Sequence, residues 1–287
     1  LVAQASPRGV GDRVGAADAV VAPRLTRMSV YLARAQQRMA LPWEPAGVPL
    51  GGWSLIGGDP DDPASIRDAT LSPTRLALEG LGAAATRTAA GATLQEARRQ
   101  ALPYVRALQN RDGGFRFAAV ADDPLNKAGL VRSGVAGAGP SSAAADRPAD
   151  EARSYGSATA DGLAALAACD VEPADRAFQA AVAWLDAHPG VDHVPGFEEQ
   201  AGGPPSARHG LVFYYRASLA RAMRLASDAR FARQHVPLAE SLVAEQRADG
   251  SWANASALMR EDDPLIATAW ALCALSQVRP LVLQQDR

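Results

Sequence analysis

The stretches LQNRDGGF (Leu108–Phe115) and EQRADGSW (Glu245–Trp252) share a spacing that decides the fold. Each contains a glutamine, then an aspartate–glycine pair, then an aromatic residue two positions after the glycine. Each also follows a segment with helical periodicity. Internal similarity of this kind is typical of repeat proteins, in which one supersecondary unit stacks on the next. The two stretches therefore predict a fold built from repeated units.

Hydrophobic periodicity predicts four such units, each an amphipathic outer helix followed by a more apolar inner helix. The inner segments are apolar nearly all round, so they must be covered on several sides, which an outer row of helices would do. Alanine carries much of the 48% hydrophobic content of the 287 residues and favours helix. The predicted outer helices are 20–38, 93–109, 174–188 and 232–246, and the predicted inner helices are 64–84, 153–169, 208–226 and 264–278.

Outside these helices the sequence predicts a loose tail and one insertion. Residues 1–19 are polar and rich in glycine and alanine, which is typical of a flexible N-terminal tail. Residues 20–287 are then a single domain, interrupted at about 120–154 by a segment rich in glycine, alanine and serine. A loop of that length is disordered or a mobile flap.

Composition excludes several classes of partner. The net charge of −2 and the pI near 6.1 give no electrostatic footprint for nucleic acid. No apolar run reaches the roughly 18 residues of a membrane span, so no transmembrane segment is predicted. The two cysteines, Cys169 and Cys273, are expected to be buried thiols. Ala3-Gln4-Ala5 fits the pattern before a signal-peptidase cut, so export and a cytoplasmic location both stay open.

The repeated pattern resembles the QW repeat of squalene–hopene cyclases and their relatives. Gln246, Gly250 and Trp252 match it fully, and Phe115 replaces the tryptophan in the other copy. From about Gly51 onward the chain looks like the prenyltransferase/squalene-oxidase repeat proteins abundant in planctomycete-like bacteria. The resemblance implies an all-α fold, an α/α toroid with inner and outer rings, whose glutamine and aromatic ring join neighbouring helix pairs.

Ring closure stays open at this stage, because a closed ring in these families needs more than four helix pairs. Either short helices hide in residues 40–62 and 115–150, or the ring is an incomplete arc. An arc would leave an apolar edge, which favours a dimer. The sequence thus allows a monomer or a homodimer.

The run DPDD (Asp59–Asp62) resembles the Asp-x-Asp-Asp motif of the cyclases, which makes Asp61 and Asp62 candidate catalytic acids, together with Asp161. Such an acid must stay protonated through burial and neighbouring carboxylates. The repeat favours a plainer role. Asp62-Pro63, Asp123-Pro124 and Asp263-Pro264 each follow an aromatic residue of a repeat, and aspartate before proline starts helices well.

The resemblance also raises the question of zinc, which protein prenyltransferase β-subunits bind through Asp-Gly-Cys and Tyr-His-Thr. The aligned positions are Asp161-Gly162-Leu163 and Ile266-Ala267-Thr268, so the thiolate and the imidazole are missing. His188 and His193 flank a turn beside carboxylates, which is only a weak metal pattern. No metal and no cofactor are predicted.

The starts of inner helices in a toroid tend to face its central cavity, and aromatic residues gather there. They offer π-faces to an apolar or cationic ligand, although packing in the core is the alternative. The candidate ligand-binding residues are Tyr155, His209, Tyr214, Tyr215 and Trp270.

Three functions follow. The first is a cavity for an apolar, isoprenoid-like small molecule, with terpene-cyclase-like chemistry if the protein is an enzyme. The second is a non-catalytic scaffold that binds a protein or peptide on its concave face. The third is a polysaccharide hydrolase or lyase. Fold analogy alone does not choose among them.

Overall fold

The computed structural model describes residues 8–38, 50–55, 69–120, 123, 125–131, 151–197 and 207–285. Within these residues the protein is all-α, as the sequence predicts. The exception is a short antiparallel pair, β1 (Leu130–Val131) with β2 (Glu151–Ala152), at the two described ends of the predicted insertion. The flexible or disordered character expected for most of that insertion concerns residues outside the described part.

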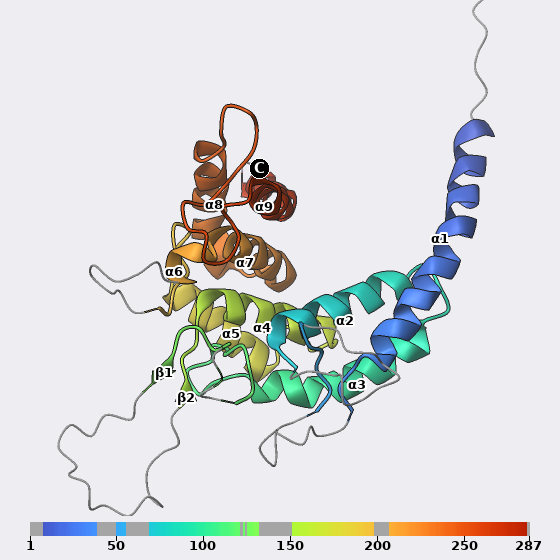
Figure 1. The fold of residues 1–287 in the computed structure, drawn as a ribbon, viewed down its shortest axis with the longest axis horizontal. Coiled ribbons are helices and arrows are strands. Elements are labelled where there is room, and N and C mark those ends of the chain that lie inside the picture. Colours follow the sequence, from blue (N-terminus) through green and yellow to red (C-terminus); the bar gives the residue numbers. More distant parts are fainter. Residues whose placement is uncertain are drawn as a thin grey trace, which may run out of the picture.

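The described helices form an inner and an outer row (Figure 1). In the inner row α2 packs on α4, α4 on α7 and α7 on α9. The outer helices pack along one side of this row. The inner helices are α2 (Leu71–Ala85), α4 (Gly156–Ala168), α7 (Val212–Ala226) and α9 (Pro264–Gln285). The outer helices are α1 (Arg8–Arg34), α3 (Gly91–Ala107), α5 (Arg176–Ala187) and α8 (Ala232–Ala244).

The two rows follow a curve, and α1 projects from one end of it (Figure 1). Among the described residues no contact as extensive as those between neighbours joins α9 back to α1 or α2. This part of the chain is therefore an open arc of helix pairs. A short helix, α6 (Ala207–Gly210), and a 3-10 turn, η3 (Ala229–Phe231), complete the described helical segments before and after α7.

Several local predictions differ from the structure. α1 begins at Arg8, so residues 8–19 are helical where a loose tail was predicted, and their alanines explain the preference. Pro103 and Pro237 fall inside predicted outer helices, where proline is expected to kink or restart a helix, and α3 and α8 continue through these positions without a restart. The predicted tail also includes residues 1–7, which lie outside the described residues.

Thr93 with Glu96 predicts a capping box at the start of the outer helix expected over 93–109, and this prediction is wrong. The helix begins at Gly91, so Thr93 is inside it, and the Glu96 carboxylate accepts from Arg99 and Gln100 instead of capping the chain start. Hydrogen bonds from these two side chains lower the pKa of Glu96. The residue before the helix, Ala90, makes no side-chain capping hydrogen bond either.

The three aspartate–proline junctions are not equivalent in structure. Asp263 caps α9, whose first residue is Pro264, and its Oδ1 accepts the Leu265 N–H at 2.9 Å. Asp123 Oδ1 accepts the Leu125 N–H at 2.7 Å, but the next α-helix in the described part starts only at Gly156. The junction at Asp62 lies outside the described residues. Capping is thus shown at one junction.

The repeat is instead carried by three turns, which we call the repeat turns: Gln36 with Gly51–Trp53, Gln109–Phe115, and Gln246–Trp252. In each, the glutamine stands two residues after the last residue of an outer helix. Its Nε2 donates to the carbonyl oxygen of a glycine with positive φ, a conformation that favours glycine. The acceptors are Gly51 (2.7 Å, φ 111°), Gly113 (2.9 Å, φ 89°) and Gly250 (2.9 Å, φ 86°).

The aromatic residue of each repeat turn is held in the same way. Its backbone N–H donates to a threonine hydroxyl in the first turns of the inner helix that packs below it. The pairs are Trp53 with Thr74 (3.0 Å), Phe115 with Thr159 (3.1 Å) and Trp252 with Thr268 (3.0 Å). In addition the indole N–H groups of the tryptophans donate to carbonyls near the end of the preceding outer helix, at Leu32 and Leu242 (both 2.7 Å). The repeat turns are therefore structural equivalents.

Burial is uneven along the inner row. Every residue of α4 from Gly156 to Leu166 is buried, since α2, α7 and α5 surround it. In α9, by contrast, Ala267, Ala271 and Ala274 are fully buried while one long face stays in solvent. Cys169 is buried at the end of α4, and burial raises the pKa of its thiol to about 12. Cys273, on α9, is exposed, so the prediction that both thiols are buried is wrong for it.

The segment Pro264–Val282 of α9 is long and apolar enough to cross a membrane by length and composition alone, with a mean hydropathy of 1.4. The sequence argument missed it because polar residues interrupt the apolar run, although only Arg279 is charged. A core helix of a soluble protein passes the same test but is mostly buried, whereas 22% of this window is buried. The alanines of α9 already pack in the main core, so membrane insertion would uncover that core.

Candidate functional site

The inner helices bring together a buried polar cluster around Asp161, one of the predicted catalytic residues. Asp161 lies on α4, Ser72 and Arg75 lie on α2, and Tyr214 lies on α7. The hydroxyls of Ser72 and Tyr214 donate to Asp161 Oδ2, the second at 2.5 Å. The Arg75 Nε forms an ion pair with Asp161 Oδ1 at 2.9 Å. The cluster therefore joins three consecutive inner helices.

Electrostatic interactions between its side chains stabilise the cluster. Burial alone would lower the pKa of Arg75, but the carboxylates of Asp161 and Glu79 raise it well above its ordinary value. Burial, and then the Asp161 carboxylate, raise the pKa of the Tyr214 hydroxyl. The arginine thus keeps its charge and the tyrosine its proton. Arg75 also pairs with Glu79 at 2.9 Å, and Glu79 pairs with Arg221 of α7 at 3.1 Å.

This geometry does not suit a catalytic acid. A carboxyl group that protonates an alkene must hold a proton and face its substrate. Asp161 is instead fully buried and surrounded by two hydroxyl donors and a guanidinium. Both oxygens of the Asp161 carboxyl group are therefore already engaged and are not free to face a substrate. The other two candidate acids, Asp61 and Asp62, lie outside the described residues.

The predicted aromatic wall is assembled in part. Tyr214 meets Trp270 of α9 edge-to-face, with ring centroids 5.0 Å apart and an interplanar angle of 86°, and both rings are half-buried. Tyr155, at the start of α4, is buried against Phe197 at 5.1 Å. Burial raises the pKa of Tyr155, and the Asp161 carboxylate adds to the effect. Three of the five predicted residues thus lie around the Asp161 cluster.

The other two are elsewhere. His209 is exposed on α6, and its backbone carbonyl accepts from Asn254 Nδ2 at 2.6 Å. Tyr215 is fully buried against Gly156, on a different side of α7 from Tyr214. Successive residues on a helix point about 100° apart, so adjacent tyrosines cannot line one wall. The sequence argument treated the pair as one feature.

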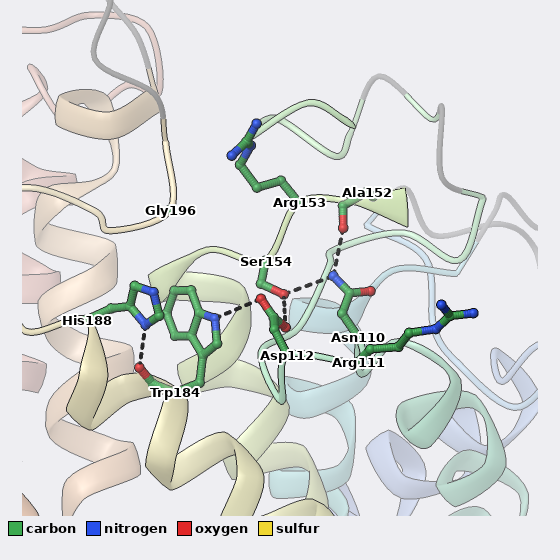
Figure 2. Close-up of a pocket in the computed structure, with 9 residues that line it drawn as sticks. All are labelled: Asn110, Arg111, Asp112, Ala152, Arg153, Ser154, Trp184, His188 and Gly196. Carbon is green, nitrogen blue, oxygen red and sulfur yellow. Dashed lines mark hydrogen bonds between the residues drawn. The ribbon is translucent and has the colours of Figure 1, made fainter. Parts of the chain in front are cut away.

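A pocket of about 340 Å³ opens beside the repeat turn Gln109–Phe115, at the end of α5 (Figure 2). At its floor Asp112 accepts three hydrogen bonds, from the Gly114 N–H (2.9 Å), the Ser154 hydroxyl (2.8 Å) and the Trp184 indole N–H (3.0 Å). The lining residues are Asn110, Arg111, Asp112, Ala152, Arg153, Ser154, Trp184, His188 and Gly196.

The serine, histidine and aspartate of this pocket do not form a hydrolytic triad. His188 stacks on Trp184, with ring centroids 4.0 Å apart, and its Nδ1 is 2.7 Å from the Trp184 carbonyl oxygen. Ser154 donates to Asp112 rather than to the histidine (Figure 2). A triad needs the base within reach of the nucleophile. Here the polar groups hold the repeat turn to α5.

A second pocket, of about 640 Å³, lies between the end of α5 and the start of α8. Pro189 stands there two residues after the last residue of α5, where the repeat turns have glutamine. The bridging amide is therefore missing at this position. The lining residues are Asp186, Ala187, Pro189, Gly190, Val191, Asp192, Arg233, Gln234 and Pro237.

Within the described part, no three His, Cys, Asp or Glu side chains gather as metal ligands would. His193 pairs through Nδ1 with Asp192 at 2.7 Å, and His188 is stacked on tryptophan. Glu198, the other carboxylate of the weak metal pattern, lies outside the described residues.

Sequence reasoning missed Ser72, Arg75 and Gln36. A serine and an arginine three residues apart on a largely apolar helix were a usable signal, because polar residues on one face of a buried helix need partners. Gln36 could not be recognised as the glutamine of a repeat turn, because many residues separate it from Gly51 in the sequence. Comparison with models of known protein families gives no match, and neither does comparison with curated proteins.

Proposed function

We propose that this protein is a non-catalytic helical-repeat scaffold that acts by binding another polypeptide at the ends of its arc. The observation that carries the proposal is where its exposed apolar side chains lie. Of the eleven large ones in the described part, eight are on the first and last helix pairs, and α3, α4, α5 and α7 have none. The eight are Met28, Val30, Tyr31, Leu76, Val236, Val243, Leu265 and Leu272.

Such a distribution is unusual for terminal repeats. Solenoid proteins need terminal repeats with polar outer faces to stay soluble, because each internal repeat buries its apolar faces against two neighbours. Leu265 of α9 is 79% exposed and Leu272 is 55% exposed, and both lie on one helical face seven residues apart. An apolar face of this kind is typical of a surface that binds protein.

The buried polar cluster supports the same proposal. Its carboxylate, on α4, is surrounded by donors from two neighbouring helices, α2 and α7, so it stabilises the contact between the three helices and presents no reactive group. The pocket beside the repeat turn Gln109–Phe115 holds one carboxylate, Asp112, which already accepts three hydrogen bonds. Glycosidic hydrolysis needs two carboxylates that flank the scissile bond. A hydrolase is therefore not favoured by these residues.

A second candidate function is binding of an apolar small molecule, as the resemblance to terpene cyclases implies. The half-buried pair Tyr214 and Trp270 favours it, because the two rings present apolar edges beside the inner row. Tyr214 is, however, committed through its hydroxyl to Asp161.

Native mass spectrometry after mild extraction separates the two functions. The scaffold predicts that any bound species is a polypeptide and that it is lost from the double variant Leu265→Glu/Leu272→Glu. A matched control is Leu125→Glu, which adds a charge at an exposed leucine outside the end pairs. A co-purified apolar small molecule that survives Leu265→Glu/Leu272→Glu and is lost from Trp270→Ala would overturn the scaffold in favour of the second candidate.

A further inference from the structure

Neighbouring helix pairs in this protein are held together by a contact that we call a joint. Each joint has two halves, one contributed by each helix pair. One half is a repeat turn, whose glutamine makes a second hydrogen bond to the next outer helix. Gln36 Nε2 donates to the Ala97 carbonyl of α3 at 3.0 Å, and Gln109 Nε2 donates to the Ala177 carbonyl of α5 at 2.8 Å. Both acceptors lie at the same position counted back from the helix end, residue 97 in a helix ending at 107 and residue 177 in a helix ending at 187.

The other half is an aromatic residue of the outer helix, three positions before its last residue: Tyr104 in α3 and Trp184 in α5. Each ring covers the residue that follows the positive-φ glycine of the repeat turn. A β-carbon on Gly52 would lie 2.7 Å from the Tyr104 ring, and one on Gly114 would lie 2.8 Å from Trp184 Nε1. Both aromatic side chains are buried. A joint therefore needs a glutamine turn on one side and an aromatic helix on the other.

At the two ends of the arc, each half is present without its counterpart. Gln246 is exposed, and within the described part its Nε2 donates to Gly250 alone. A β-carbon on Gly113 would lie 2.7 Å from the Ala180 carbonyl oxygen of the next helix, whereas one on Gly250 would meet only the amide of Gln246, at 3.9 Å. The turn has the shape of a joint, but no helix of the described part covers it.

At the opposite end, α1 carries the aromatic half. Tyr31 lies three positions before the helix end at Arg34, as Tyr104 does in α3, and it is 50% exposed. Met28 lies where Ala101 lies in α3, and it is 59% exposed. The face of α1 that corresponds to the buried docking face of α3 is therefore in solvent.

The junction between α5 and α8 shows that the halves depend on one another. There Pro189 replaces the glutamine, and Ser241 stands three positions before the end of α8 in place of the aromatic residue. Inside the chain, both halves are thus absent from the same junction. Their retention at the two ends implies that each of them has a counterpart.

We propose that copies of this chain associate head to tail, with the repeat turn Gln246–Trp252 of one copy receiving α1 of the next around Tyr31. The inference rests on the proposed function and names the bound polypeptide as a second copy. The Tyr31 hydroxyl then has an acceptor in Asp249, the equivalent of the Asp112 that accepts from Trp184. Leu265 and Leu272 of α9 would cover Leu76 of α2, as inner helices pack on one another within the arc.

Charge favours the same pairing, although the fit is looser than inside the chain. Arg24 and Arg27 of α1 occupy the places of Ala97 and Gln100, both exposed, and would face Asp249 across the contact. Arg247 is the one cation in the same repeat turn as Asp249. Ser251 takes the place of Gly52 and Gly114, so its side chain holds the Tyr31 ring farther out. The association is therefore weaker than an internal joint and depends on concentration.

Sedimentation velocity of the full chain tests the proposal. Head-to-tail contacts build open chains unless the rotation between copies closes a ring, so the mean mass should rise with concentration above that of the monomer, and beyond that of a dimer where the chains stay open. Tyr31→Glu removes one half and Ser251→Trp fills the space of the other, so each variant alone should stay monomeric. Both residues lie on the surface, and circular dichroism confirms that each variant is folded. Leu125→Glu is the control that should associate as the native chain does.

Mixing the two variants gives the deciding result. The Tyr31→Glu copy keeps an intact turn and the Ser251→Trp copy keeps an intact α1, so the mixture should form one-to-one dimers that grow no further. Ser251→Gly should tighten self-association, and Gln246→Ala should weaken it by about fivefold or more, the effect of one hydrogen bond. A native chain that stays monomeric, or variants that associate alone, would overturn the proposal. If the chain stays monomeric but binds a different polypeptide that Leu265→Glu/Leu272→Glu loses, only the head-to-tail inference fails.

Discussion

Replacing Gln109 and Gln246 by alanine in separate variants compares one side chain in two surroundings. Both glutamines stand in equivalent repeat turns and donate to the turn glycine at 2.9 Å. Only Gln109 also reaches the next outer helix, through the Ala177 carbonyl. The two variants therefore differ by the contact that joins neighbouring helix pairs.

The expected difference follows from the hydrogen bonds. A typical one contributes about 0.5–1.5 kcal/mol net, so the loss of two at a partly buried site costs about 2 kcal/mol. The carbonyls of Gly113 and Ala177 also lose a partner there, which adds to the cost. Gln246→Ala loses one bond in solvent, where water replaces the amide, and should cost about 0.5 kcal/mol or less.

Urea unfolding measured at a concentration where the chain is monomeric reads both costs, provided the slope with denaturant is unchanged. The expected result is a clear drop in midpoint for Gln109→Ala and almost none for Gln246→Ala. Equal drops in the two variants would refute the reasoning, since they would show that the inter-repeat bond contributes nothing.

Three further predictions concern the packing, the helix start and the pH dependence. Gly162→Ala should cost about 1–3 kcal/mol, because a β-carbon there would overlap the Phe115 ring, whereas Gly82→Ala, with nothing within 4 Å, should be neutral or stabilising; thermal unfolding of both variants checks this. Asp263→Ala should cost about 1 kcal/mol through loss of the α9 cap, and Asp123→Ala should cost less because no helix follows; a similar loss in urea unfolding for both would count against the assignment. The Arg230 guanidinium lowers the pKa of Asp228 to about 2 from its ordinary 3.8, so its contribution is present above pH 4 and is lost as the pH falls toward 2. Asp228→Asn should then be less stable than the native chain at pH 6 by about 1 kcal/mol after solvent screening, and the gap should close near pH 2; a gap that persists at pH 2 contradicts this.

The sequence predicted the helix pairs because their periodicity is local. An amphipathic outer segment and an apolar inner one keep their character wherever they pack, so all four pairs formed near the predicted residues. Boundaries moved where tertiary contacts outweighed local signals, as at α3, which begins before Thr93. The start of α1 at Arg8 shows the opposite failure, in which glycine content outweighed alanine in the prediction.

The glycine and aromatic residues identified the repeat correctly. The aspartate–proline pairs, which were also taken as markers of the repeat, are not equivalent in the structure. Aspartate–proline was a tempting marker, yet Asp123 caps no helix in the described part. The glutamine contacts are long-range, and Gln36 is separated in sequence from the glycine that it holds. Spacing alone therefore could not reveal the first repeat turn.

The candidate site was predicted in part for similar reasons. Asp161 was singled out through the family resemblance, and Tyr214 and Trp270 as aromatic residues at inner helix starts, and the fold brings them together. What the sequence could not show is the arginine from α2 that pairs with the acid, because that contact depends on the packing of α2 on α4. The partner changes the interpretation of Asp161 from a proton donor to a structural carboxylate.

Gln36, Gln109 and Gln246 each donate to the glycine of their repeat turn, and Gln36 and Gln109 also donate to the next outer helix. In the proposed assembly, Gln246 makes this second contact only with another copy of the chain. Side-chain amide exchange by NMR tests it most directly. We expect the Nε2 protons of Gln36 and Gln109 to exchange slowly at any concentration, and those of Gln246 to exchange fast in dilute protein and slowly in concentrated protein. Equal protection of all three in dilute protein, or fast exchange at Gln109, would contradict the account.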